Sequence, residues 1–422
     1  MNAIDLISRR PVAWAACVCV LGLAAGVAHA DDEDTPLYLS LSHRITRDSN
    51  FSRDANKQGE TINATALEVG IDKAYGRQRY RGGARLTHND YAHYGDQLNN
   101  DGKNLSGTVS SGIARNWLVS LDGSYDENLN AIQNNLAGNA RVVRNIRKYS
   151  DGNVTVQYGN GGRWALVGSL DANKLRYSDE TYAYQNADQH SGGLKLVYYS
   201  SDLLNFGLGG RRVWTSYNNY QNSNESETIS DNAIDLSSNW KVTGLSQLSA
   251  FYSRRRSTYA TDTSRHSRGW TANVNWDYTP RGLLSYRAGY TRASGNDRLD
   301  QNNPVQYLLW TIDSITDINY NTLTTTYNLG ADYQATGKVR VSLDYRLTQY
   351  EIDNVYTSVL NGIDGAASSN SINHNVSLGV HYAYSRSLNM GCSATKYSQT
   401  KDFSRVAYEG RSATCFASLT ID

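Results

Sequence analysis

The segment at residues 270–291, WTANVNWDYTPRGLLSYRAGYT, decides the fold class because apolar and polar side chains alternate along both of its halves. In the first half, one parity carries Trp270, Ala272, Val274, Trp276 and Tyr278, and the other carries Thr271, Asn273, Asn275 and Asp277. This two-residue period is typical of a strand with one apolar face. A tight turn at 279–282 reverses the chain, and the pattern resumes from 284 to 291. The segment therefore predicts a β-hairpin, which a water-soluble sheet could also contain.

The composition of the 422-residue chain favours a membrane-spanning barrel over several soluble domains. Hydrophobic residues make up only 39% of the chain, which is not typical of several helical or α/β cores. The 31 tyrosines and eight tryptophans argue against disorder, because disordered segments are poor in aromatic residues. A barrel explains the mixture, since only alternate residues of each strand meet lipid. The net charge of +1 argues against a nucleic-acid-binding protein.

The first 30 residues have the features of a secretory signal peptide. Arg9 and Arg10 precede an apolar run at 12–27, and Ala28-His29-Ala30 resembles a cleavage site. A membrane anchor is the alternative, although the run is short and ends in small residues. No later window is apolar enough for a membrane-spanning helix, so any crossing after residue 30 is made by strands. We expect residues 31–422 to form a single barrel domain.

The hairpin pattern recurs along the chain, with eight short turns that predict eight hairpin junctions. The turns fall near 76, 116, 159–162, 200–202, 241–244, 280–282, 335–337 and 385–387. One further strand at each terminus gives an antiparallel up-and-down meander of about 18 strands, with 16 as the alternative. The strand number depends mainly on 303–322, where 308–318 is either a strand or a folded loop. An even-stranded barrel of this kind belongs in the outer membrane of a Gram-negative bacterium.

Long polar segments alternate with the short turns and predict the orientation of the barrel. In such barrels the short turns face the periplasm and the long loops face outside. The predicted external loops are 48–60, 127–138, 217–227, 295–306 and 357–370. Most of them are rich in Asn, Asp, Ser and Gly, which suit solvated loops.

Several arginines have the parity opposite to the apolar residues of their strands and are expected to point into the lumen. They are Arg79, Arg81, Arg85, Arg211, Arg287, Arg340 and Arg346. On the lipid face each would cost about 2–4 kcal/mol near the middle of the membrane. Two interpretations stay open: the arginines brace the wall through Asp122, Asp171, Asp277 and Asp344, or they line a path for a passing polymer. For Arg287, the bracing partner would be Asp277, across the strand pair.

The histidines show no metal-ligand spacing, and no Ser-centred elbow, phosphate loop or paired-cysteine zinc pattern appears. We therefore expect no enzyme activity, no cofactor and no metal. Cys392 and Cys415 are equidistant from the middle of the last connecting loop, so they are expected to lie opposite each other in the final hairpin. A cross-strand disulfide is the favoured interpretation, with two separate buried thiols as the alternative.

The chain resembles the EpsL-like outer-membrane barrels of exopolysaccharide biosynthesis clusters. The resemblance rests on 47–51 after the first strand, the segment 74–80, the strands around Trp117 and the cysteine pair of the final hairpin. The early segment is less acidic than is usual in that family, and the chain ends in Thr420-Ile421-Asp422 without a terminal aromatic residue.

This resemblance implies export of a polysaccharide across the outer membrane, with outer-membrane lipid around the barrel and a periplasmic polysaccharide-export protein as its partner. The alternative is a general or substrate-selective uptake porin for small solutes. A barrel hydrolase acting on the polymer is a third possibility, for which no catalytic residues can be named.

Overall fold

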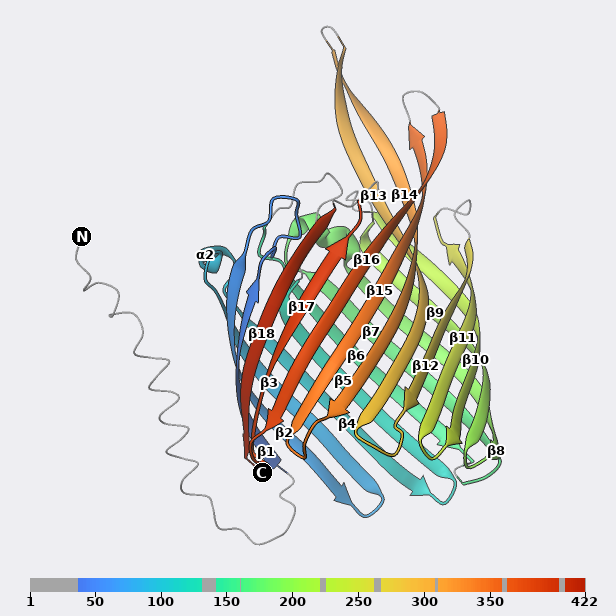
Figure 1. Ribbon diagram of the computed structural model, residues 1–422. Helices are drawn as coiled ribbons and strands as arrows, with labels where there is room; N and C mark the ends of the chain where they lie inside the picture. The colour runs from blue at the N-terminus through green and yellow to red at the C-terminus, as the bar shows by residue number, and fades with distance from the viewer. Residues whose placement is uncertain are drawn as a thin grey trace, which may run out of the picture.

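The computed structural model is a closed barrel whose wall is one antiparallel sheet of 18 strands (Figure 1). It describes residues 37–130, 142–159, 161–220, 225–261, 267–307, 310–358, 363–401 and 407–421. The prediction of an outer-membrane barrel of about 18 strands is confirmed, and the alternative of 16 strands is wrong. The predicted signal peptide at 1–30 lies outside the described residues.

The strands follow one another around the wall in chain order. They are β1 Leu37–Asp48, β2 Glu60–Tyr75, β3 Gln78–Tyr91, β4 Asn100–Ala114, β5 Trp117–Leu129, β6 Ile146–Tyr158, β7 Trp164–Tyr177, β8 Ala187–Ser201, β9 Leu204–Tyr220, β10 Glu225–Thr243, β11 Ser246–Tyr259, β12 Ser267–Tyr278, β13 Leu284–Tyr307, β14 Trp310–Gln334, β15 Val339–Ser358, β16 Ile363–Ala383, β17 Leu388–Gln399 and β18 Tyr408–Ile421. Two short helices, α2 at Gly95–Leu98 and η1 at Glu180–Gln185, lie in connections between strands. No helix in the described part of the chain is long and apolar enough to cross a membrane.

The barrel closes where the first strand pairs with the last. Leu39 of β1 lies opposite Ile421 of β18, and the pairing runs without a break to Asp48 opposite Ser412. On its other edge, β1 pairs with β2 over its whole length. Every strand therefore has two neighbours, so no strand edge is left unpaired in the membrane.

The outer surface of the wall is apolar across neighbouring strands. Leu41, Leu67 and Leu86 form one row across β1, β2 and β3 because the register places them opposite one another. Leu86 is 59% exposed, as is expected of a side chain that lipid covers. Alternate residues of the same strands are polar and face the lumen. Because only strands that satisfy their backbone groups within a closed sheet can cross the bilayer, this is an outer-membrane barrel.

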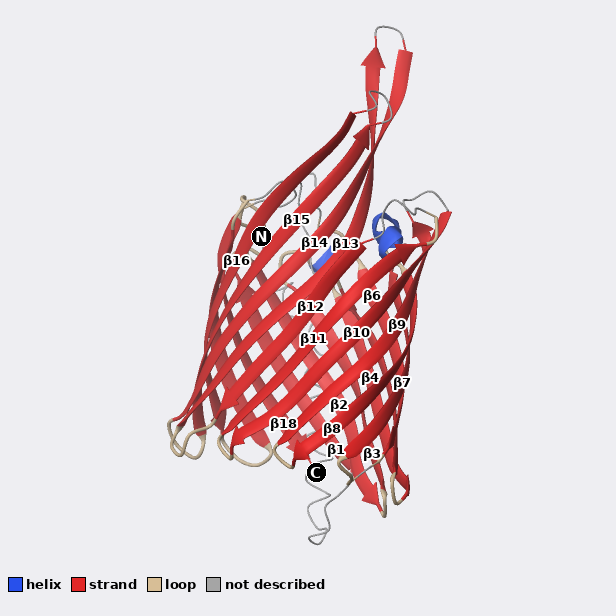
Figure 2. Cartoon of the chain, turned by 90° about the vertical axis from the view of Figure 1, so that its right-hand side faces the viewer, coloured by secondary structure: helices blue, strands red, loops and turns tan. Residues whose placement is uncertain are grey.

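One side of the wall extends far beyond the rest at the rim that carries the long loops (Figure 2). The extension is formed by β13–β16, and pairing in the β13–β14 hairpin continues up to Tyr307 opposite Trp310. The loop predicted at 295–306 is therefore wrong, and the predicted loop at 357–370 is reduced to a short connection between β15 and β16. Strand pairing depends on backbone hydrogen bonds, so above the membrane a strand needs no apolar face.

Candidate ligand site on the lumenal wall

A hollow of about 720 Å³ lies on the wall built by β1–β6, and its lining includes many polar and charged side chains. The lining includes carboxylates from β2 and β5 and guanidinium groups from β3 and β6: Glu68, Asp72, Asp126, Arg81, Arg85 and Arg147. Tyrosines add hydroxyl groups and ring faces, because Tyr38 and Tyr149 also line the hollow.

The arginines of β3 share two carboxylates of β2. Arg79 donates two hydrogen bonds to Asp72, at 2.9 and 2.8 Å, and Arg81 donates one to the same carboxylate at 3.3 Å. Arg85 lies 3.5 Å from Glu68, which also accepts a hydrogen bond of 3.0 Å from Tyr38. The pairs arise because the β2–β3 register sets Asp72 opposite Arg81 and Glu68 opposite Arg85.

These ion pairs leave donor groups turned to the lumen. Arg81 contacts Asp72 only through Nε, and its side chain is 55% exposed. Arg85 is 39% exposed. Across the hollow, Arg147 lies 3.9 Å from Asp126, too far for a direct hydrogen bond. Exposed ion pairs of this kind are weak, so an anion entering the hollow can compete for the same guanidinium groups.

Arg211 and Arg287 also pair with carboxylates, but on other parts of the wall. Arg211 lies 3.2 Å from Asp235 of β10. Arg287 reaches Asp332 at 3.2 Å and Asp344 at 3.0 Å, and the described residues show no ion pair between it and Asp277. Asp277 lies opposite Arg287 in the register of β12 and β13 and is exposed.

Gly330 explains how Arg287 reaches a carboxylate two strands away. The register places Gly330 of β14 between Arg287 of β13 and Asp344 of β15. A Cβ at Gly330 would lie 2.8 Å from the Asp344 carboxylate and 3.0 Å from Nε of Arg287. Because Gly330 has no side chain, the guanidinium group of Arg287 can cross β14 and reach the carboxylate of Asp344.

The remaining predicted lumenal arginines have no carboxylate partner among the described residues. Arg346 donates to the side-chain oxygen of Asn328 at 2.9 Å. Arg340 is exposed near the short turn between β14 and β15. Of the carboxylates proposed as partners, Asp122 accepts from Thr108 and Ser120, and Asp171 accepts from Asn153 and Ser191. The predicted residues therefore occupy several wall positions and do not form one cluster.

Cys392 and Cys415 form a disulfide and lie opposite each other in the β17–β18 register. Both side chains are on the outer face of the wall, next to Ala394, Ala413 and Ile45 of the neighbouring strand positions. The bond therefore joins the final hairpin on its lipid-facing side.

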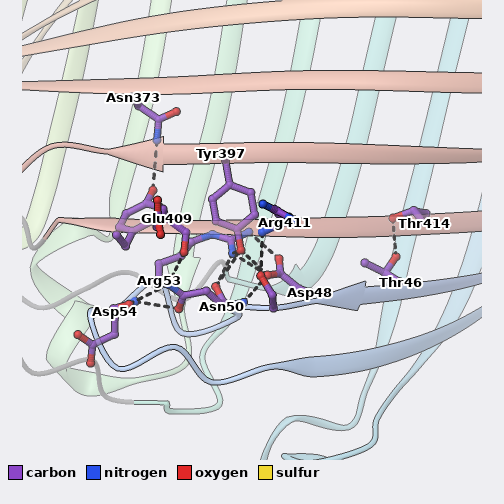
Figure 3. A network of polar contacts seen from close by, with 12 residues as sticks. Thr46, Asp48, Asn50, Arg53, Asp54, Asn373, Tyr397, Glu409, Arg411 and Thr414 are labelled. Atoms are coloured by element: carbon purple, nitrogen blue, oxygen red, sulfur yellow. Dashed lines mark hydrogen bonds and ion pairs between the residues drawn. The ribbon is translucent and has the colours of Figure 1, made fainter.

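A buried polar network, which the sequence patterns did not predict, closes the seam between β1 and β18 at the rim with the long loops (Figure 3). Tyr397 is 5% exposed and donates its hydroxyl hydrogen to Asp48, which is 6% exposed. Arg53 pairs with the same carboxylate at 2.9 Å and lies over the Tyr397 ring at 3.8 Å. Asn50 donates to the backbone carbonyl of Glu409 at 3.0 Å. Asp48 and Asn50 belong to the segment 47–51 noted in the sequence, but their role needs partners about 350 residues away.

A second buried carboxylate holds the neighbouring loop at this rim. Glu60 is 3% exposed and accepts hydrogen bonds from the backbone amides of His93 and Tyr94, at 3.0 and 2.9 Å. Burial raises the pKa of Tyr94, and the charge of Glu60 raises it further. Phe51 packs against Tyr91 and Tyr94 with ring centroids 5.6 and 5.9 Å apart. These contacts join the connection between β3 and β4 to β2 at this rim.

Among solved structures, the chain is similar to outer-membrane receptors for iron compounds. The siderophore receptor PirA of Acinetobacter baumannii is 9% identical, with a TM-score of 0.44 over 93% of this chain and 81% of that one. A mutant of the ferric enterobactin receptor PfeA of Pseudomonas aeruginosa is 8% identical, with a TM-score of 0.46 over 93% and 81%. The iron transporter FrpB of Neisseria meningitidis is 10% identical, with a TM-score of 0.45 over 92% and 83%.

These comparisons contradict the functions expected from the sequence. The structures named are siderophore receptors and an iron transporter, not polysaccharide-export barrels or general porins, and they are not enzymes. The predictions of polysaccharide export and of an uptake porin are therefore wrong. The polysaccharide ligand and the periplasmic export partner are wrong with them. At this level of identity the likeness shows the fold alone, so what those receptors bind remains a property of those proteins.

No family model matches the chain, and no curated protein is similar to it at a significant level. The resemblance to EpsL-like barrels therefore stays a prediction from the short motifs that carry it.

Proposed function

We propose that the protein is an outer-membrane receptor that takes an anionic ligand from outside and binds it in the lumen, on the wall formed by β1–β6. The observation that carries the proposal is the hollow of about 720 Å³ into which Arg81, Arg85 and Arg147 project. Arginine presents several N–H donors in a planar fork that suits carboxylate-like oxygens. The proposed role is binding and passage, without a catalytic step.

The neighbouring carboxylates make the site selective as well as attractive. Asp72 and Glu68 lie 3.3 and 3.5 Å from Arg81 and Arg85, and Asp126 lies 3.9 Å from Arg147. A ligand that offers oxygens at matching positions exchanges weak, exposed ion pairs for charge-assisted hydrogen bonds. A simple ion cannot span the hollow, so we expect a larger ligand with several acceptor oxygens.

The proposal is tested with an anionic ferric tricatecholate as the probe, because its catecholate oxygens carry negative charge on a compact body. Purified barrel in detergent is titrated by isothermal calorimetry, and the double variant Arg81→Gln, Arg85→Gln is compared with the wild-type protein. We expect the double variant to bind about tenfold more weakly, since it loses two charged donors.

The matched control is Arg340→Gln, which removes an exposed lumenal arginine away from the hollow and should leave binding unchanged. Heat-modifiable migration in gel electrophoresis verifies that each variant is folded. Equal binding by the wild type and the double variant would refute the site. A wild-type protein that binds neither this chelate nor ferric citrate would overturn the proposed function.

A further inference from the structure

The outer face of β9–β13 carries five arginines at the upper edge of the apolar band. They are Arg212, Arg254, Arg256, Arg268 and Arg292. Their parity is that of the lipid-facing side chains, because Leu208, Ile234, Trp270 and Tyr252 on the same strands are exposed. The register joins the arginines into one surface: Arg212 and Arg256 both lie opposite Asn232, and Arg256 lies opposite Arg268.

All five arginines lie at nearly the same height above the periplasmic turns. Arg212, Arg254 and Arg292 stand eight residues from Leu204, Ser246 and Leu284, the strand ends at those turns. Arg256 and Arg268 stand ten residues from Ser246 and Tyr278. In a tilted strand eight to ten residues rise about 20–25 Å, which is the height of the apolar band of an outer-membrane barrel. The cluster is thus level with the headgroups of the outer leaflet.

No acidic side chain neutralises this cluster among the described residues. Arg256 faces Arg268 directly across β11 and β12, and like charges in that position destabilise a sheet. The guanidinium of Arg292 lies over the ring of Trp270 at 4.0 Å, and its buried Nε has no hydrogen-bond partner. The exposed guanidinium groups of Arg256 and Arg268 therefore offer donors to an anion from outside the protein.

Basic residues on another part of the outer face have different surroundings. Glu127 lies 3.6 Å from both Lys103 and Lys148, and Arg176 pairs with Asp188 at 2.6 Å. Basic side chains at that side of the wall are thus compensated within the protein. The contrast shows that, in the described part of the chain, the five outer arginines of β9–β13 lack the acidic partners that these basic residues of β4–β8 have.

We infer that the arginine cluster of β9–β13 binds the phosphorylated glucosamine headgroup of a lipid A-type glycolipid in the outer leaflet. Two phosphate groups would occupy the two centres of positive charge, one between Arg256 and Arg268 and one beside Arg254 and Arg292. The acyl chains would lie along the apolar surface below, where Leu208, Leu236 and Val274 face lipid. Guanidinium–phosphate contacts are among the strong charge-assisted hydrogen bonds.

The test uses delipidated protein in detergent and native mass spectrometry, with bisphosphorylated lipid A, monophosphorylated lipid A and phosphatidylglycerol as probes. We expect bisphosphorylated lipid A to bind most tightly. The double variant Arg256→Gln, Arg268→Gln should weaken its binding by about tenfold or more, because charged hydrogen bonds to phosphate are lost. The matched control, Lys148→Gln with Arg176→Gln, removes two basic residues that already have acidic partners and should change the affinity by less than about twofold.

Equal weakening by the test and control variants would overturn the inference, as would equal affinity of the wild type for lipid A and phosphatidylglycerol. If the double variant fails to show heat-modifiable migration, the single variant Arg268→Gln takes its place, with the same expected direction and the same contradicting result. Because the cluster faces lipid and the hollow faces the lumen, this outcome is independent of the ferric-chelate titration.

Discussion

Arginine has different surroundings on the two faces of this wall. Inside the barrel, Arg79, Arg81 and Arg85 share carboxylates of the adjacent strand. Outside, Arg256 and Arg268 face each other without an acidic neighbour in the described residues. The exposed ion pairs of the inner face are weak and can be exchanged for contacts with a ligand, whereas the outer arginines have no carboxylate among the described residues to give up. The two proposed sites therefore differ in whether a ligand has to displace a carboxylate.

A single hydroxyl group links the seam network at the rim. In Tyr397→Phe, the buried carboxylate of Asp48 loses one donor while Arg53 and the backbone amide of Asn50 remain. Leaving a buried acceptor partly unsatisfied costs about 1–3 kcal/mol. We expect the urea midpoint of unfolding from lipid vesicles to fall accordingly.

Tyr75→Phe is the control for that measurement, because Tyr75 is 74% exposed at the opposite rim and its change should be neutral. A midpoint for Tyr397→Phe that equals the control would show that the network contributes nothing to closure of the barrel.

At the scale of the strands, aromatic rings lie over glycines of the neighbouring strand. Phe416 of β18 is opposite Gly391 of β17, Tyr397 of β17 is opposite Gly410 of β18, and Tyr38 of β1 is opposite Gly70 of β2. A Cβ at Gly391 would lie 2.7 Å from the Phe416 ring and 3.0 Å from the carbonyl oxygen of Val380. These glycines therefore give space for rings that pack along the wall around the seam.

We expect Gly391→Ala to destabilise the barrel by about 1–3 kcal/mol, because an added methyl group overpacks a site that contains both a ring and a backbone oxygen. Gly210→Ala is the matched control: Gly210 also lies within a strand, but a Cβ there would have nothing within 4 Å. Differential scanning calorimetry in detergent compares the two. Equal melting temperatures would show that the Phe416 ring moves aside without cost.

For the whole molecule, the tall extension of β13–β16 is separable from the membrane barrel. Asn296 and Asn321 lie opposite each other in the β13–β14 hairpin, beyond Arg292, where the pairing of β13 with β12 ends. Replacing residues 297–320 by an Asn-Gly turn should leave every pairing below this level intact, since a two-residue turn suits an antiparallel pair. We expect the shortened protein to keep its heat-modifiable migration. Loss of that property would show that the extension is needed for assembly.

The fold was largely predictable, whereas the contacts within it were not. Alternation in 270–291 and the regular spacing of short turns are local patterns, and the strand number follows from them. The partners of Arg287 depend on the register of three strands and on a missing side chain at Gly330, which no local pattern reveals. The polar composition of 295–306 also led to a wrong prediction of a loop there. Polar residues indicate exposure to water, which does not exclude strand pairing.

The function could be predicted even less well than the contacts. Short motifs around 47–51 and the cysteine pair suggested polysaccharide export, but Asp48 and Asn50 of that segment form a buried network that closes the seam. The basic cluster on the outer face of β9–β13 was present in the sequence at regular parity. The cluster can be recognised only from the strand register, which shows which basic residues have acidic neighbours.

The outward position of the Cys392–Cys415 bond determines when the disulfide can form and when it can be reduced. Once the wall is surrounded by hydrocarbon, thiolates and water-soluble reductants have no access to these sulfur atoms, because thiol–disulfide exchange requires an attacking thiolate. Oxidation therefore has to precede insertion, in the aqueous periplasm. After insertion the bond is preserved by the bilayer itself, so the oxidation state of this hairpin is fixed for as long as the protein stays in the membrane.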